Sequence, residues 1–212
     1  MRYRKSAVSA AQIVAAATRV IARQGYAQSS LNDIAREAGM SKGAVHYHFP
    51  TKEVLVAKVL ETACAAVTER TMQTWRRQEA DPFEALRASI RELWDVRVQR
   101  TEEAMVVADL LSHALHDEAL RPPLAAYYRF AAAQTAQHLV HMASTYRLRP
   151  KVGAELIPRL LLGLLDGLMM QAYVEPGVID PDELVAAVEQ IAAGLFEAAP
   201  PDAEPLGGGS TR

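Results

Sequence analysis

The chain has 212 residues, of which 50% are hydrophobic and 6% aromatic, and its formal net charge at pH 7 is −2. This length can bury a sizeable core in one large or two small domains, and the abundance of alanine and leucine favours helix over sheet. The single cysteine excludes an intramolecular disulfide and no run of 18 apolar residues occurs, so we expect a cytoplasmic protein without a membrane span.

The charge is distributed unevenly along the chain. Residues 1–58 carry nine Lys or Arg and three acidic residues, a net charge of +6, whereas the remaining residues carry 14 and 22, a net charge of −8. A basic N-terminal part joined to an acidic body is typical of a DNA-binding module followed by a domain that does not bind DNA. Chance asymmetry between solvated faces is the alternative.

The first helix is predicted over residues 9–24, where apolar residues recur at helical spacing. A short basic arm is expected before it, at residues 2–5, and Gly25 is expected to end it. We expect this helix to support the two helices that follow.

Residues 29–53 predict two short helices joined by a tight turn. Ser30 is a candidate N-cap, and Asp33 stands three residues later, where its carboxylate can reach back to the amide of the cap. Gly39 is expected to end this helix in the left-handed conformation, and Ser41 is the candidate N-cap of the next helix.

The second of these helices has two different faces. Val45 and Phe49, four residues apart, are expected to point into a small core. The opposite face carries Gly43 for close approach, with His46 and Tyr47 able to hydrogen-bond bases or phosphates. A helix, a glycine turn and an exposed second helix are typical of a helix-turn-helix DNA-binding motif.

Residues 9–60 resemble the DNA-binding domain of TetR-family transcriptional regulators. The resemblance covers a quarter of the chain and is far more specific than a generic helix-turn-helix, because many positions match in order. The chain differs from the family at His46, where members usually have a tyrosine that faces the DNA. The matching residues are Ile13 to Ala17, Gly25, Tyr26, Leu31, Asp33 to Ala35, Ala38, Gly39, Ser41 to Ala44, Tyr47 to Phe49, Lys52 and Glu53.

The resemblance implies a homodimeric, ligand-responsive transcriptional regulator, most often a repressor, that binds double-stranded palindromic operator DNA and is released by a small-molecule effector. Some side chains should hold phosphates, namely Lys42, Tyr47, His48 and Lys52. Others should face base edges, namely Gly43, Ala44 and His46. The full set expected at the DNA is Ser30, Ser41, Lys42, Gly43, Ala44, His46, Tyr47, His48 and Lys52.

The fold class expected is all-α, with a three-helix DNA-binding domain followed by a helical ligand-binding and dimerisation domain. A fourth helix is predicted from Lys52 into the seventies, linking the two. Later helices are predicted over 81–100, 102–116, 121–146, 151–174 (interrupted or kinked at Pro158) and 180–198, which makes nine helices and no sheet. The predicted domains are residues 1–50 and 51–198, with a disordered tail at 199–212.

The segment 160–170 is apolar on nearly every side, so we expect it to be buried in a core or between subunits. Gly163 and Gly167 allow a neighbouring helix to approach closely. The resemblance implies that the last two long helices form a four-helix bundle across a dimer axis; a purely internal core is the alternative. The predicted interface residues are Leu160, Gly163, Leu164, Gly167, Leu184, Val188, Ile191 and Leu195.

The resemblance also implies an effector pocket in the body. Its candidate residues are Trp94, Met105, Asp109, His113, Tyr127, His138 and Met169. Asp109, His113 and His116 share one predicted helix face and could hold a metal, but ordinary polar side chains are the alternative, and no metal or cofactor is assigned.

Two other classes of function are possible. A metal-dependent enzyme would use these histidines, yet the chain has no nucleophile motif and no phosphate-binding glycine loop, so we expect no enzyme activity. An architectural DNA-binding protein without an effector would not need a body of this size.

Overall fold

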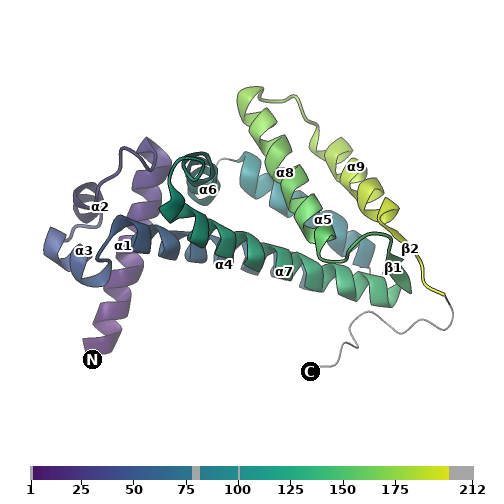
Figure 1. Cartoon of the computed structure of the whole chain (residues 1–212), viewed down its shortest axis with the longest axis horizontal. Coiled ribbons are helices and arrows are strands. Elements are labelled where there is room, and N and C mark those ends of the chain that lie inside the picture. Colours follow the sequence, from purple (N-terminus) through teal and green to yellow (C-terminus); the bar gives the residue numbers. More distant parts are fainter. Residues whose placement is uncertain (1, 78–81, 100, 201–212) are drawn as a thin grey trace. The chain divides into compact units, whose positions relative to one another are not determined.

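The computed structural model describes residues 2–77, 82–99 and 101–200. Within these ranges the backbone forms nine α-helices, one short 3-10 helix (η1) and a two-stranded sheet (Figure 1). The predicted all-α fold is confirmed. The elements are α1 (Arg2–Gln24), α2 (Leu31–Glu37), α3 (Lys42–His48), α4 (Lys52–Arg77), α5 (Pro82–Val98), α6 (Glu102–His113), η1 (Glu118–Leu120), α7 (Arg121–Thr145), β1 (Leu148–Pro150), α8 (Leu156–Val174), α9 (Pro181–Gly194) and β2 (Phe196–Ala198).

Three local expectations were wrong. The basic arm expected at residues 2–5 is helical, because no glycine or proline separates it from the rest of α1. The helix expected over 151–174 begins only at Leu156, so Pro158 lies in the first turn, where its missing N–H breaks no helical bond and causes no interruption.

The third error concerns the sheet. The last helix ends at Gly194, and residues 196–198 form β2, which pairs antiparallel with β1 in a register that places Arg149 opposite Glu197. These two side chains form an ion pair at 2.7 Å. Strands of three residues are too short to show a recognisable alternation of polar and apolar residues, so the sequence pattern did not indicate them.

The helices divide into two compact units. One contains Met1–Ala66 and Arg100–Tyr128, and the other contains Val67–Gln99 and Arg129–Arg212. Both α4 and α7 continue from one unit into the other. The boundary predicted at residue 50 is not tested by this division and stays a prediction. Most of the predicted tail, from residue 201 onward, lies outside the described residues.

The first unit has a core built from six helices and η1. Apolar side chains of α1 to α4 form most of it, including the fully buried Ile13, Ile34 and Val45. Leu110 of α6 and Leu120 of η1 are also fully buried in this same cluster. The helix-turn-helix segment therefore rests on residues that come from later in the chain.

In the second unit, α5 packs against α8 and α9, and α8 also packs against α9. Trp94 of α5, Leu165 of α8 and Val188 of α9 are almost fully buried. By length and composition alone, α8 passes the criterion for a membrane-spanning helix, with 33% of the span buried; core helices of soluble proteins pass it too.

Candidate nucleic-acid interface and predicted ligand and dimer sites

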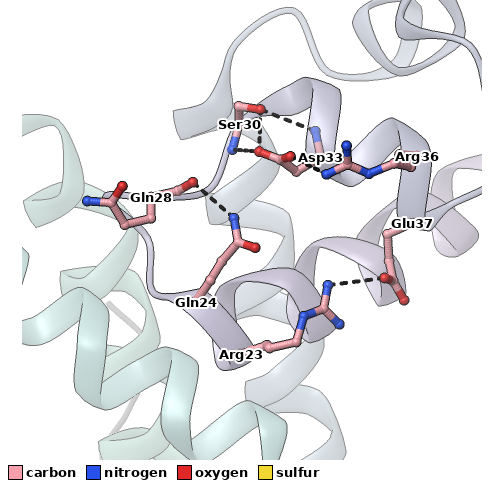
Figure 2. A network of polar contacts seen from close by, with 7 residues as sticks. All are labelled: Arg23, Gln24, Gln28, Ser30, Asp33, Arg36 and Glu37. Atoms are coloured by element: carbon pink, nitrogen blue, oxygen red, sulfur yellow. Dashed lines mark hydrogen bonds and ion pairs between the residues drawn. The ribbon is translucent and has the colours of Figure 1, made fainter.

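A reciprocal hydrogen-bond cap fixes the start of α2. The Ser30 hydroxyl accepts from the backbone N–H of Asp33 (3.2 Å), and the Asp33 carboxylate accepts from the backbone N–H of Ser30 (3.1 Å) and from its hydroxyl (2.5 Å). Arg36 adds an ion pair to Asp33 at 2.6 Å (Figure 2). The hydrogen bonds from Ser30 hold the pKa of the Asp33 carboxyl below its ordinary value. The predicted cap is confirmed, and the Ser30 hydroxyl is engaged in it.

A second polar network joins α1 to α2. Glu37 accepts from Arg19 at 2.8 Å and from Arg23 at 3.2 Å, and these bonds lower the pKa of its carboxyl. The Gln12 side chain donates to the carbonyl of Ala38 at 2.8 Å. Figure 2 shows the Arg23–Glu37 contact beside the α2 cap. These contacts orient the helix-turn-helix segment on its supporting helix.

The turn and α3 have the geometry that the sequence predicts. Gly39 has a φ of 65°, which is the left-handed region that glycine adopts without strain. The Ser41 hydroxyl accepts from the backbone N–H of Ala44 at 3.2 Å and caps α3. Val45 and Phe49 are buried in the core of the first unit, as expected.

The outer face of α3 is open to solvent. Lys42, Gly43 and His46 are exposed, and Tyr47 is 81% exposed, which is unusual for so large an aromatic side chain. The ring of His48 packs edge-on against Tyr47, with centroids 5.2 Å apart. The face of α3 that is predicted to contact DNA is therefore open to solvent along one side of a capped helix.

Lys52 makes an internal contact in this structure. Its ammonium group donates to the backbone carbonyl of Tyr26 and lies 3.8 Å from the centroid of the Tyr26 ring. Partial burial lowers the pKa of this ammonium group, and the nearby carboxylates of Glu53 and Asp109 act in the opposite direction. In this structure the ammonium group holds the turn after α1. Its predicted contact with phosphate stays a prediction.

Asp109 and His113 of α6 lie against the same turn. The Asp109 carboxylate accepts from the backbone N–H of Tyr26 at 2.5 Å, and the His113 ring packs edge-on to the Tyr26 ring. Sequence reasoning placed both residues in an effector pocket and missed this contact. Eighty-three positions separate Asp109 from Tyr26, and no local pattern links them.

The predicted effector residues belong to both units. Met105, Asp109, His113 and Tyr127 belong to the first, whereas Trp94, His138 and Met169 belong to the second. His138 lines a small internal cavity of the second unit, and Trp94 and Met169 are buried there. Burial, followed by repulsion from His141, lowers the pKa of His138. A shared pocket for these residues stays a prediction.

The metal-ligand triplet suggested by the sequence has other contacts. Asp109 binds the backbone of Tyr26, and the Nδ1 atom of His113 lies 2.9 Å from the carbonyl oxygen of Asp109. His116 is exposed. Across the part of the chain that the structure describes, no group of three or more His, Cys, Asp or Glu side chains is placed to hold a metal ion.

The predicted dimer residues differ in burial. Leu184 and Val188 are buried within the second unit, and Leu164 and Leu195 are partly buried. Leu160, Gly163, Gly167 and Ile191 are exposed.

The exposed members on α8 belong to a longer stripe. It alternates steps of four and three residues and consists of Leu156, Leu160, Gly163, Gly167, Met170 and Val174. Val174 is 86% exposed and Met170 49%. We call this set the α8 stripe.

Comparison with known proteins agrees with this geometry. Residues 13–59 match the family described as bacterial regulatory proteins, tetR family. Residues 82–197, more than half of the chain, match the C-terminal domain described as that of BetI-type transcriptional repressors. The chain belongs to the TetR family. Known members of this family are DNA-binding transcriptional regulators.

Individual TetR-family relatives are distant. The transcriptional regulator TtgR of Pseudomonas putida is 30% identical over 100 residues, which cover 45% of this chain and 48% of TtgR. The matched segment thus spans about half the length of that relative. A TetR-family structure from Mesorhizobium loti aligns with a TM-score of 0.74 at 22% identity, covering 90% of this chain and 98% of the other.

One similar structure contains a ligand. The Bacillus subtilis regulator FadR, in complex with stearoyl-CoA, aligns with a TM-score of 0.69 at 20% identity over 85% of this chain and 96% of FadR. At these identities the two structural matches show a shared fold.

Proposed function

We propose that this TetR-family protein is a homodimeric repressor that binds a palindromic operator and is released by a small-molecule effector. The observation that carries the DNA-binding part is the exposed outer face of α3, held by caps at Ser30 and Ser41. Lys42, Tyr47 and His48 contact phosphates, whereas Gly43, Ala44 and His46 approach base edges in the major groove.

The α8 stripe supports a dimer. An apolar stripe with steps of four and three residues is the pattern by which helices pack along each other. At Gly163 and Gly167 no neighbouring group of the described part of the chain lies within 4 Å of the point where a Cβ atom would stand, so a second helix can approach the backbone there. Ile191 of α9 is also exposed. A two-fold pair of such chains presents two α3 helices to two half-sites of an operator.

Repression and effector control are supported by the comparisons. The C-terminal match is to a domain described as that of a repressor, and the similar FadR structure contains stearoyl-CoA. The second unit contains a cavity of about 530 Å³, which is in the size range of small-molecule sites. An effector that binds more tightly to a dimer arrangement unable to bind DNA shifts the population away from the DNA-binding state. Such a regulator acts in the cytoplasm and needs no enzyme activity.

A selection of binding sites from random DNA tests this proposal. The expected product is a palindrome whose half-sites lie in successive major grooves on one side of the duplex. A variant with Lys42→Ala and His46→Ala together, which leaves the α3 cap intact, is the matched control and should bind more weakly and recover a motif without the base preference that His46 confers. Recovery of a single unpaired half-site, bound by a monomer, would contradict the dimeric part of the proposal.

A further inference from the structure

A small internal cavity lies within the second unit, between α5, α7, α8 and α9. Its volume is about 40 Å³. The walls are mainly leucine, isoleucine and valine side chains, and three polar residues interrupt them: Ser89, Thr135 and His138. Among the residues that the structure describes, no Asp, Glu, Lys or Arg side chain lines it.

Ser89 is the unusual member of this set. The residue is 4% exposed, and its hydroxyl has no hydrogen-bond partner among the described residues. A serine inside a helix often donates to the carbonyl four residues earlier, but this one does not. A buried hydroxyl without a partner destabilises a fold, and alanine at this position would remove that cost. The orphan hydroxyl therefore points to a partner that comes from outside the chain.

The other two polar residues can share such a partner. The Thr135 hydroxyl donates to the carbonyl of Ala131 at 3.0 Å, which leaves its oxygen able to accept. Burial lowers the pKa of His138, so its imidazole is neutral at neutral pH and has one donor and one acceptor nitrogen. Donors and acceptors thus meet in a space that holds no charge.

We propose that this cavity is the polar end of the effector site and that the effector is a mainly apolar molecule that places an uncharged hydroxyl or similar hydrogen-bonding group there. This inference rests on the proposed function and deepens it. The hydrogen-bonding group of the ligand pairs with Ser89 and with Thr135 or His138. A charged group is disfavoured at this end of the ligand, because none of the residues that line the small cavity could serve as its counter-ion, whereas the larger cavity is lined in part by Arg129, Glu155 and Arg159.

The position of Leu139 indicates where the rest of the ligand lies. The cavity alone has room for little more than a water molecule. The side chain of Leu139 is 4% exposed and lines both this cavity and the larger one of about 530 Å³. A change of its rotamer joins the two spaces, so the apolar body of the ligand occupies the larger cavity and its polar end reaches Ser89.

Three probes of similar size test the proposal: 4-ethylphenol, 4-ethyltoluene, in which a methyl replaces the hydroxyl, and the anion 4-ethylbenzoate. Calorimetry measures their binding to wild type, Ser89→Ala, Leu139→Ala and the control Ser112→Ala, whose serine is exposed in the first unit. We expect wild type to prefer the phenol, and Ser89→Ala to bind it about tenfold more weakly while its affinity for 4-ethyltoluene is kept. Leu139→Ala should bind the phenol more tightly, because it opens the wall.

Four outcomes of these measurements contradict the proposal. Equal binding of 4-ethylphenol and 4-ethyltoluene by wild type, tighter binding of the benzoate that is lost in Ser89→Ala, an unchanged phenol affinity in Ser89→Ala, or no binding of the phenol by wild type and by Leu139→Ala would each overturn the proposal. Should Leu139→Ala fail to fold, the comparison of Ser89→Ala with Ser112→Ala decides. Operator binding without any probe is measured in parallel. Absence of operator binding by wild type would refute the proposed function. Operator binding without phenol binding would refute only this inference.

Discussion

The Asp109 carboxylate on α6 accepts a hydrogen bond of 2.5 Å from the backbone N–H of Tyr26. The turn that carries Tyr26 leads from α1 into α2, so a residue from outside the helix-turn-helix segment fixes its entry. Lys52 holds the same turn through the carbonyl and ring of Tyr26.

Asp109→Ala should lower stability and operator affinity together. It leaves the N–H of Tyr26 without its acceptor, and the loss of a partner to a buried amide costs about 1–3 kcal/mol. Asp109→Asn, which keeps an acceptor oxygen, is the control and should lose less. Urea unfolding and operator titrations measure both effects. Unchanged stability in the alanine variant would show that water replaces the carboxylate without cost.

Lys42 and Lys52 should give different results. Lys42→Ala should lower the salt slope of operator binding by about one unit, because one phosphate contact is lost. Lys52→Ala should instead lower the free energy of unfolding, since it removes the contacts with Tyr26. Binding isotherms over a range of salt concentrations separate the two. An equal fall in slope for Lys52→Ala would mean that Lys52 leaves Tyr26 to hold a phosphate.

His46→Ala should relax the base preference at one position in each half-site. The residue is exposed one turn after Lys42, on the outer face of α3 that we propose approaches the groove. A lost base contact costs about 1–3 kcal/mol at the preferred site and less at other sequences. Parallel selections from random DNA with wild type and variant measure this. Identical motifs combined with an even loss of affinity would assign His46 to phosphate instead.

Gly163→Leu or Gly167→Leu should separate the dimer without unfolding the chain. Each glycine is exposed and has free space around its Cβ position, so leucine fits within one chain but blocks a closely packed second helix. Sedimentation should show monomers, and circular dichroism should show unchanged helix content. Gly153→Leu, also in open space but outside the α8 stripe, is the control. Dimers that persist at low concentration would place the interface elsewhere.

His138 should make stability depend on pH. Burial lowers its pKa in the folded chain, so the unfolded chain binds the proton more readily. Stability is therefore complete above the ordinary histidine pKa of about 6.5 and falls as the pH drops from there towards the lowered folded value. His138→Gln should remove part of that fall, whereas His141→Gln, at an exposed site, should keep most of it. Melting temperatures across the acid range provide the measurement.

The sequence allowed the local features of the DNA-binding segment to be predicted. The Ser30 and Ser41 caps and the left-handed Gly39 depend on residues close in sequence, and the structure confirms all three. The contact of Asp109 with Tyr26 could not be predicted, because it depends on how α6 packs.

The apolar residues of α9 show a second limit. Leu184 and Val188 are buried in the unit where α9 packs against α5, whereas Ile191 is exposed. Periodicity finds an apolar face but does not tell an internal contact from one made with a partner.

The shared core of the first unit restricts how this protein can be divided. Leu110 and Leu120 fill the same cluster as Ile34 and Val45, although they lie far beyond them in the sequence. A fragment that stops after α3 or α4 would expose that cluster to water and lose the anchor at Tyr26. Exchanging DNA-recognition modules between regulators by a cut at one loop would therefore yield unstable chimeras here. A successful transplant must carry α6, η1 and the start of α7 along with the N-terminal helices.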